Sequence, residues 1–127
     1  MNKKFGTLTA MTVVLGVGLI SGCGEKTVGY NQDVLPILQK NCLECHTPPD
    51  GKGYEKSGLS MASYEELMKG TRLGPIIVPG SAASSTLNRL VEGKADPSIR
   101  MPHGGDWLPE ADRATLKAWV DQGARNN

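Results

Sequence analysis

Two cysteines and a histidine in the first half of the chain are the residues best suited to chemistry. Cys42 and Cys45 are three residues apart and His46 follows directly, which makes a CxxCH motif. On a helical turn, residues three apart lie on the same side, so both thiols can reach the vinyl groups of one porphyrin. The imidazole of His46 then lies under the ring centre as an axial ligand. The spacing favours one covalently attached haem c, with His46 as its proximal ligand.

The same residues allow three other kinds of site. A structural zinc ion also binds CxxC, but it needs two more ligands and only His103 remains among the cysteines and histidines of the fold. A thioredoxin-like dithiol would open a helix after a strand, and the residues before Cys42 do not have a strand pattern. A plain disulfide between Cys42 and Cys45 is the last alternative.

The haem interpretation requires a sixth ligand to the iron or an open distal position. Candidates are Met61, Met68, Met101 and His103. Met101 precedes Pro102 in a turn-rich segment, where the proline restricts Met101 to extended backbone and a loop can present the thioether to the distal face. Met61 and Met68 lie around a predicted helix, where methionine more often fills the core. We therefore predict Met101 as the sixth ligand, with His103 as the runner-up.

The first 22 residues are expected to be separate from the fold. Two basic residues, Lys3 and Lys4, precede a mostly apolar run from Leu8 to Ile20. This run is short for a membrane span and typical of a signal sequence. It ends in Ile20-Ser21-Gly22-Cys23, which resembles the bacterial lipobox, where the cysteine is lipidated and the chain is cleaved before it. An ordinary secretory signal or a signal anchor is the alternative. Export supports haem, because haem c is attached on the exported side of the membrane.

Four short helices are predicted to position these residues. They run from about 32 to 42, from 63 to 69, from 84 to 91, and from Pro109 to about 123, and residues 47–58 have the composition of a loop. The last helix is the clearest, because Leu116, Trp119 and Val120 form one apolar stripe along it. We expect Trp119 in the core, and Trp107 either against the haem or half exposed.

Composition limits the function as well as the fold. The 127 residues correspond to one domain, and 14 basic against 13 acidic residues exclude a nucleic-acid binder with a broad basic face. Only 5% of the residues are aromatic. A domain this small with so few large side chains has a thin core, which a non-protein group would help to fill.

The order of helix, CxxCH, loop, helices, Met-Pro and terminal helix resembles a class I cytochrome c. The stretches Gly58–Gly70, Val78-Pro79-Gly80, Met101-Pro102 and Trp119–Ala124 are closest to the planctomycete-type cytochrome c domain. The resemblance implies an all-α fold of three to four helices around one covalently bound haem. It carries Cys42, Cys45 and His46 over as attachment and proximal residues, and Met101 as the distal ligand. The family commonly has Met-Pro-Pro, where this chain has His103 in the third place.

The sequence therefore predicts a monohaem c-type cytochrome lipoprotein that is an electron-transfer protein and not an enzyme. The alternative is a haem-based sensor or small peroxidase with an open distal site. Residues 1–22 would be the signal peptide, 23–30 a tether lipidated at Cys23, and 31–127 the cytochrome domain. The expected partners are redox proteins of the membrane or periplasm, reached by a monomer anchored on the periplasmic side and with no nucleic acid involved.

Overall fold

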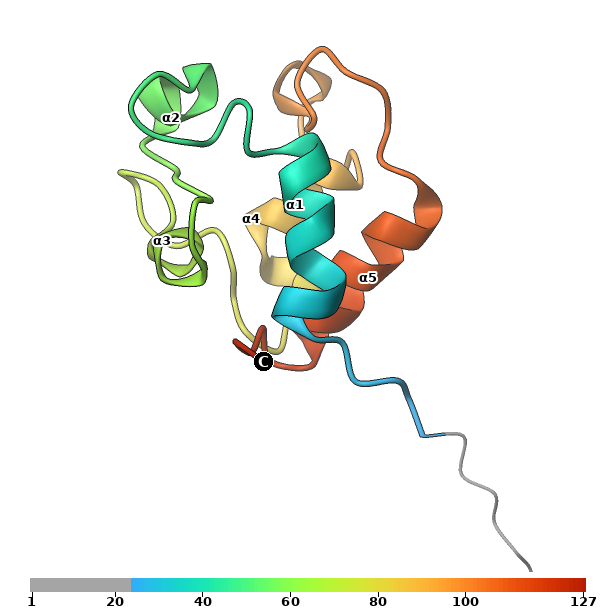
Figure 1. The fold of residues 1–127 in the computed structure, drawn as a ribbon. Coiled ribbons are helices and arrows are strands. Elements are labelled where there is room, and N and C mark those ends of the chain that lie inside the picture. The colour runs from blue at the N-terminus through green and yellow to red at the C-terminus, as the bar shows by residue number, and fades with distance from the viewer. Residues whose placement is uncertain (1–23) are drawn as a thin grey trace, which may run out of the picture.

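The computed structural model describes residues 24–127, so the predicted signal peptide and Cys23 lie outside the described residues. Within this range the chain folds into five short α-helices and no strand (Figure 1). The helices are α1 (Leu35–Asn41), α2 (Lys52–Ser57), α3 (Tyr64–Lys69), α4 (Thr86–Val91) and α5 (Glu110–Asp121). A π-helical turn, Tyr30–Val34, leads into α1, and 3-10 turns occupy Ala82–Ser84 and Pro97–Ile99. The predicted all-α class is confirmed.

The helix predicted from about 32 to 42 is a π-helical turn that begins at Tyr30 and continues as α1 to Asn41. Gly29 occupies the cap position, and its N–H donates a hydrogen bond to the Asp33 carboxylate at 2.9 Å. Pro36 lies in the first turn of α1, where its missing N–H costs no hydrogen bond within the helix. Val34 and Leu38 are fully buried, so this helix turns its predicted apolar face into the core.

The prediction of a plain loop over residues 47–58 was wrong, because this segment contains α2. With α2 the described residues hold one helix more than the three to four expected. The helix is fixed by a tertiary contact, since the Tyr54 N–H donates to the Cys45 carbonyl at 2.9 Å. It ends at Gly58, whose φ of 75° is the left-handed conformation that favours glycine.

The other helices follow local signals closely. Ser63 caps α3 by accepting a hydrogen bond from the Glu66 N–H at 3.2 Å, and Gly70 ends the helix. The predicted helix 84–91 is split into a 3-10 turn and α4, with Ser85 between them. Pro109 immediately precedes α5, as expected for a residue that favours helix starts.

The core lies between α1, α3, α4 and α5, and three aromatic rings meet at one end of it. Tyr30 lies 5.2 Å from Tyr64 and 5.7 Å from Trp119 between ring centroids. Trp119 is fully buried and donates its indole N–H to the Arg125 carbonyl at 3.0 Å. The prediction of Trp119 as a core residue is confirmed.

Among residues 24–127, the longest helix is α5, and none of the helices combines the length and apolar character needed to cross a membrane.

Candidate haem site

The CxxCH motif forms a tight turn directly after α1. The Cys42 N–H donates to the Leu38 carbonyl at 2.8 Å, which continues the helical pattern. The N–H groups of Cys45 and His46 both donate to the Cys42 carbonyl, at 3.1 and 2.9 Å. These bonds hold the three functional residues on one turn, as the sequence spacing predicted.

Both thiols of the motif are free, and they differ in environment. Cys42 is half-buried against the core, whereas Cys45 is exposed. Burial, and next the neighbouring Cys45, raises the pKa of the Cys42 thiol to about 11. In the haem-free chain at neutral pH the Cys42 thiol is therefore protonated.

His46 is buried, and its ring is oriented from behind by the backbone. Its Nδ1 lies 3.4 Å from the Leu59 carbonyl oxygen, and its own carbonyl accepts from the Met61 N–H at 2.8 Å. Burial lowers the pKa of the imidazole, and the Leu59 carbonyl partly opposes this change. A neutral ring with its proton on Nδ1, facing Leu59, leaves the Nε2 lone pair for iron. The Leu59 carbonyl was not predicted from the sequence, because any residue type supplies one.

Gly53 forms a wall of the site next to the same ring. A Cβ at this position would lie 2.7 Å from Cε1 and 2.9 Å from Nε2 of His46. Both distances are shorter than van der Waals contact allows, so only glycine leaves the imidazole in this place. Gly53 therefore contributes to the site because it has no side chain, which leaves room for the His46 ring.

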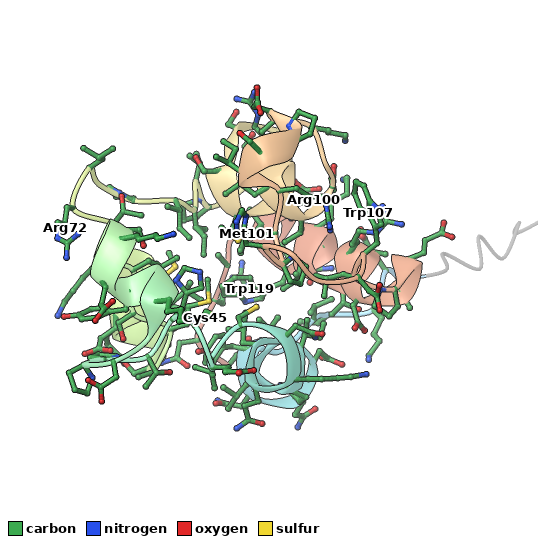
Figure 2. All side chains as sticks on the ribbon, turned by 90° about the horizontal axis from the view of Figure 1, so that it is seen from above. Cys45, Arg72, Arg100, Met101, Trp107 and Trp119 are labelled. Carbon is green, nitrogen blue, oxygen red and sulfur yellow. The ribbon has the colours of Figure 1, made fainter. Side chains whose placement is uncertain are left out.

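The candidates for the sixth ligand occupy different surroundings. Met101 is half-buried, packs against the core, and is fixed by a hydrogen bond from its N–H to the Leu90 carbonyl at 3.2 Å. Figure 2 places Met101 and Cys45 toward the middle of the molecule, on two different segments. His103 is exposed, and Met61 is 3% exposed within the core.

Met61 is bound through its backbone to the proximal histidine. Its N–H bonds to His46, and it is two residues from the Leu59 carbonyl that faces the His46 ring. A sixth ligand must approach the iron from the face opposite to the proximal histidine. Met101 is instead held by α4, because its N–H bonds to the Leu90 carbonyl; this separate attachment favours Met101 as the sixth ligand.

Two polar side chains, one in α4 and one in the segment between α4 and α5 (residues 92–109, here called the Met101 loop), have buried atoms without a partner among the described residues. Both the amide nitrogen and the amide oxygen of Asn88 are unpaired, although the residue is only 1% exposed. Arg100, next to Met101, donates to the Gly105 carbonyl at 2.7 Å and lies 4.6 Å from the centre of the Trp107 ring, but its Nη1 is buried and unpaired. Because buried polar groups almost always have partners, these atoms fit a polar group that the chain itself does not contribute. The carboxylates of a haem could accept hydrogen bonds from the Asn88 Nδ2 and the Arg100 Nη1, whereas the Asn88 Oδ1, itself an acceptor, needs a donor.

Two further side chains lie in the Met101 loop, Trp107 and Lys94. Trp107 is half exposed, at 54%, which is one of the two positions predicted for it. Lys94 forms an ion pair with Glu92. Within residues 24–127, no three His, Cys, Asp or Glu side chains converge as a metal site made by the protein alone would require.

The donor set and its surroundings thus fit a covalently attached haem: two free thiols, a neutral and oriented imidazole, a thioether, and unpaired polar atoms. Comparison with known families agrees. The family model described as Planctomycete cytochrome C matches residues 42–105, just over half of the chain and beginning at the first cysteine of the motif. The chain belongs to this family of cytochromes c, whose members are haem-binding proteins of electron transfer. No curated protein and no solved structure matches the chain significantly.

Proposed function

We propose that this protein is a lipid-anchored monohaem cytochrome c that carries single electrons between redox proteins of the membrane or periplasm. The observation that carries the proposal is the CxxCH turn, in which the His46 Nδ1 faces the Leu59 carbonyl and its ring rests against Gly53. The motif occurs once in the sequence, which supports one haem and one electron per cycle.

Each residue has a separate part in this function. Cys42 and Cys45 would hold the haem covalently, and its iron supplies reversible one-electron chemistry. The Leu59 carbonyl and Gly53 fix the orientation of His46. Met101 would close the distal position, so that no substrate can bind there, and a thioether ligand raises the reduction potential relative to a second histidine. Burial of the site limits the rearrangement of water when the charge changes.

The predicted anchor concerns Cys23, which lies outside the described residues. The apolar run before it and the small residues Ser21 and Gly22 support lipidation and export. Several acyl chains on one residue exceed what stable membrane attachment requires. We therefore propose that the domain works on the periplasmic side of a bacterial membrane.

The test is the pyridine haemochrome spectrum of the exported protein, together with the mass of the mature chain. The expected results are the absorption of a haem with two thioether bonds and a mass that begins at an acylated Cys23. Replacement of both cysteines, Cys42→Ser with Cys45→Ser, should abolish the covalent haem but leave the acylation. A purified exported protein without covalent haem would overturn the electron-transfer function. A high-spin oxidised spectrum would instead support the sensor or peroxidase.

A further inference from the structure

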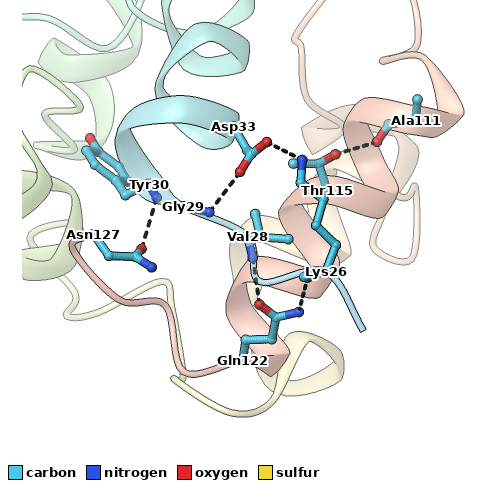
Figure 3. Close-up of polar contacts among 9 residues, drawn as sticks. All are labelled: Lys26, Val28, Gly29, Tyr30, Asp33, Ala111, Thr115, Gln122 and Asn127. Atoms are coloured by element: carbon cyan, nitrogen blue, oxygen red, sulfur yellow. Dashed lines mark hydrogen bonds and ion pairs between the residues drawn. The ribbon is translucent and has the colours of Figure 1, made fainter. Parts of the chain in front are cut away.

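The chain that follows the predicted anchor is bound firmly to the C-terminal end of the domain. The side-chain amide of Gln122, just after α5, makes two hydrogen bonds to it (Figure 3). Its Oε1 accepts from the Val28 N–H at 2.8 Å, and its Nε2 donates to the Lys26 carbonyl at 3.0 Å. These two hydrogen bonds fix residues 26–28 beside α5, and we refer to them as the Gln122 clamp.

Further contacts extend the attachment on both sides of the Gln122 clamp. Asn127 accepts from the Tyr30 N–H through its side chain at 3.2 Å and from the Asn31 N–H through its carbonyl at 3.1 Å. The Lys26 ammonium lies 2.9 Å from an Asp33 carboxylate oxygen. From Lys26 onward the chain is therefore part of the domain.

This attachment shortens the free tether. Only Gly24 and Glu25 stand between Cys23 and Lys26, and three Cα steps of 3.8 Å span about 11 Å at most. A domain of about 100 residues has a radius of gyration of about 13 Å. A tether shorter than the radius of the body that it holds does not allow that body to turn over. The end that carries the Gln122 clamp must stay next to the bilayer.

The haem-binding residues lie at the other end. From Tyr30, the π-helical turn and α1 together extend for 12 residues, or about 18 Å at 1.5 Å per residue, before the chain reaches Cys42. Figure 1 shows this end of α1 and the orange loop around residues 95–105 at the top, while the blue segment toward the anchor leaves at the bottom. The CxxCH turn and the Met101 loop thus lie far from the attachment point.

We propose that the haem-binding end of this protein faces away from the bilayer and exchanges electrons with a soluble carrier protein rather than with a quinone or an enzyme embedded in the membrane. The proposal rests on the lipidation of Cys23 proposed above. Two exposed apolar side chains of the Met101 loop, Ile99 at 51% and Trp107 at 54%, offer such a partner a contact surface at this end. The near-balanced charge of the chain requires no strongly charged partner.

The test measures which end of the lipidated holoprotein is near the membrane. Once haem and lipid occupy the native cysteines, a new one can take a spin label alone, at Asn126→Cys beside the Gln122 clamp or at Lys52→Cys at the start of α2. Both positions are exposed. The protein is placed on phosphatidylcholine vesicles that contain nickel-chelating lipid, with the haem reduced so that its low-spin iron is diamagnetic. Relaxation of the label by the nickel should be several-fold stronger at position 126 than at position 52.

The outcomes separate the two proposals. If the protein does not float with the vesicles in a density gradient, the lipid anchor itself fails. If it floats but the two labels relax equally, or position 52 relaxes more, the orientation is wrong.

A variant that lacks the Gln122 clamp provides the second part of the experiment. Gln122→Ala removes both bonds of the clamp and leaves the exposed Lys26–Asp33 ion pair as the one polar contact that holds residues 26–28 within the described part of the chain. The tether can then lengthen, so the difference between the two labels should shrink. Thr115→Ala is the matched control on the same helix, because its hydroxyl bonds only to the Ala111 carbonyl within α5. An unchanged label difference in Gln122→Ala would show that the clamp does not orient the domain.

Discussion

Gly53 shows how strongly the site depends on one missing methyl group. In the interior of a helix, replacing glycine by alanine alone favours folding by about 1 kcal/mol. Here the new Cβ would lie 2.7 Å from Cε1 of His46, and overpacking costs about 1–3 kcal/mol. We expect Gly53→Ala to lower the free energy of unfolding of the holoprotein and to change its visible spectrum, measured by denaturant titration at the haem band.

The matched control for this variant is Gly105→Ala. Its Cβ would lie 3.5 Å from Pro102, an ordinary contact. We expect a change in unfolding free energy below about 0.5 kcal/mol, as for most surface substitutions. If Gly53→Ala behaved in the same way, the imidazole would not be held against this glycine.

The identity of the sixth ligand gives the second prediction. Met101→Ala should lower the reduction potential strongly and remove the methionine-to-iron charge-transfer band of the oxidised protein, because a thioether stabilises the reduced iron. His103→Ala, two residues away and exposed, should change neither. The measurements are a redox titration and the near-infrared edge of the absorption spectrum. The reverse result would assign the ligand to His103.

The two cysteines should react differently in the chain before haem attachment. Burial raises the pKa of Cys42 to about 11, and the thiolate is the reactive form. We expect iodoacetamide to modify Cys45, which is exposed, well before Cys42 at pH 8, with Cys42 reacting fully only near pH 11. Mass spectrometry of peptides at several times measures both rates. Equal rates at pH 8 would mean that Cys42 is not buried without haem.

At the level of single residues, the sequence predicted the groups that react with haem but not the neighbouring groups that orient them. The spacing of Cys42, Cys45 and His46 is itself the signal, so these residues were found directly. The Leu59 carbonyl is a backbone group, and the two unpaired atoms of Asn88 become notable only when the residue is known to be buried. Neither leaves a pattern in the sequence.

At the level of elements, Asp121 joins α5 to the 3-10 turn Ala82–Ser84. Its carboxylate accepts from the Ala82 N–H at 2.8 Å and from the Lys117 ammonium at 2.5 Å. The bond from Lys117, and next that from Ala82, lowers the pKa of Asp121 below its usual 3.8. The link therefore stabilises the fold at pH values above 3.8, and this contribution is lost as the pH falls through the lower pKa of the folded state.

We therefore expect Asp121→Asn to be less stable than the wild type at pH 6, with the difference decreasing as the pH falls below about 3.8. Denaturant titrations over this pH range measure it. A difference that stays constant down to pH 2 would show that the carboxylate charge does not contribute.

Helices with local boundary signals were predicted well, and α2 was not. Ser63 and Gly70 mark the two ends of α3 in the sequence itself. The segment of α2 follows two prolines and contains glycines, which favour a loop. Its helix depends on the contact between Tyr54 and Cys45, which are close only in the folded chain.

For the whole molecule, the near-zero net charge predicts the behaviour in salt. The formal net charge is +1 for the whole chain and becomes −1 (12 basic against 13 acidic residues) once Lys3 and Lys4 leave with the proposed signal peptide, so long-range steering of small charged reagents should be weak. We expect the rates of electron exchange with ferricyanide and with hexaammineruthenium to change less than about threefold between about 10 and 150 mM salt. Stopped-flow absorption measures both. Strong and opposite salt effects for the two reagents would reveal a local charged patch at the haem-binding end.

The positions of most helices followed from the sequence pattern and the all-α class from the resemblance to a known family, but the joining of the chain ends followed from neither. Gln122 bonds to a residue 94 positions earlier in the chain, and Asn127 to one 97 positions earlier. No periodicity in the sequence predicts such pairs. Contacts of this separation depend on the finished fold.

The bond between Tyr30 and Asn127 also sets an order of events in time. A contact can form only when both of its residues are present in the same compartment, so the Tyr30 segment cannot join the C-terminal segment before Asn127 is there. The CxxCH turn emerges about 80 residues before Asn127. Any machinery that attaches haem during this interval meets a domain that is still open at its C-terminal end, with the thiols accessible before the final helix has docked.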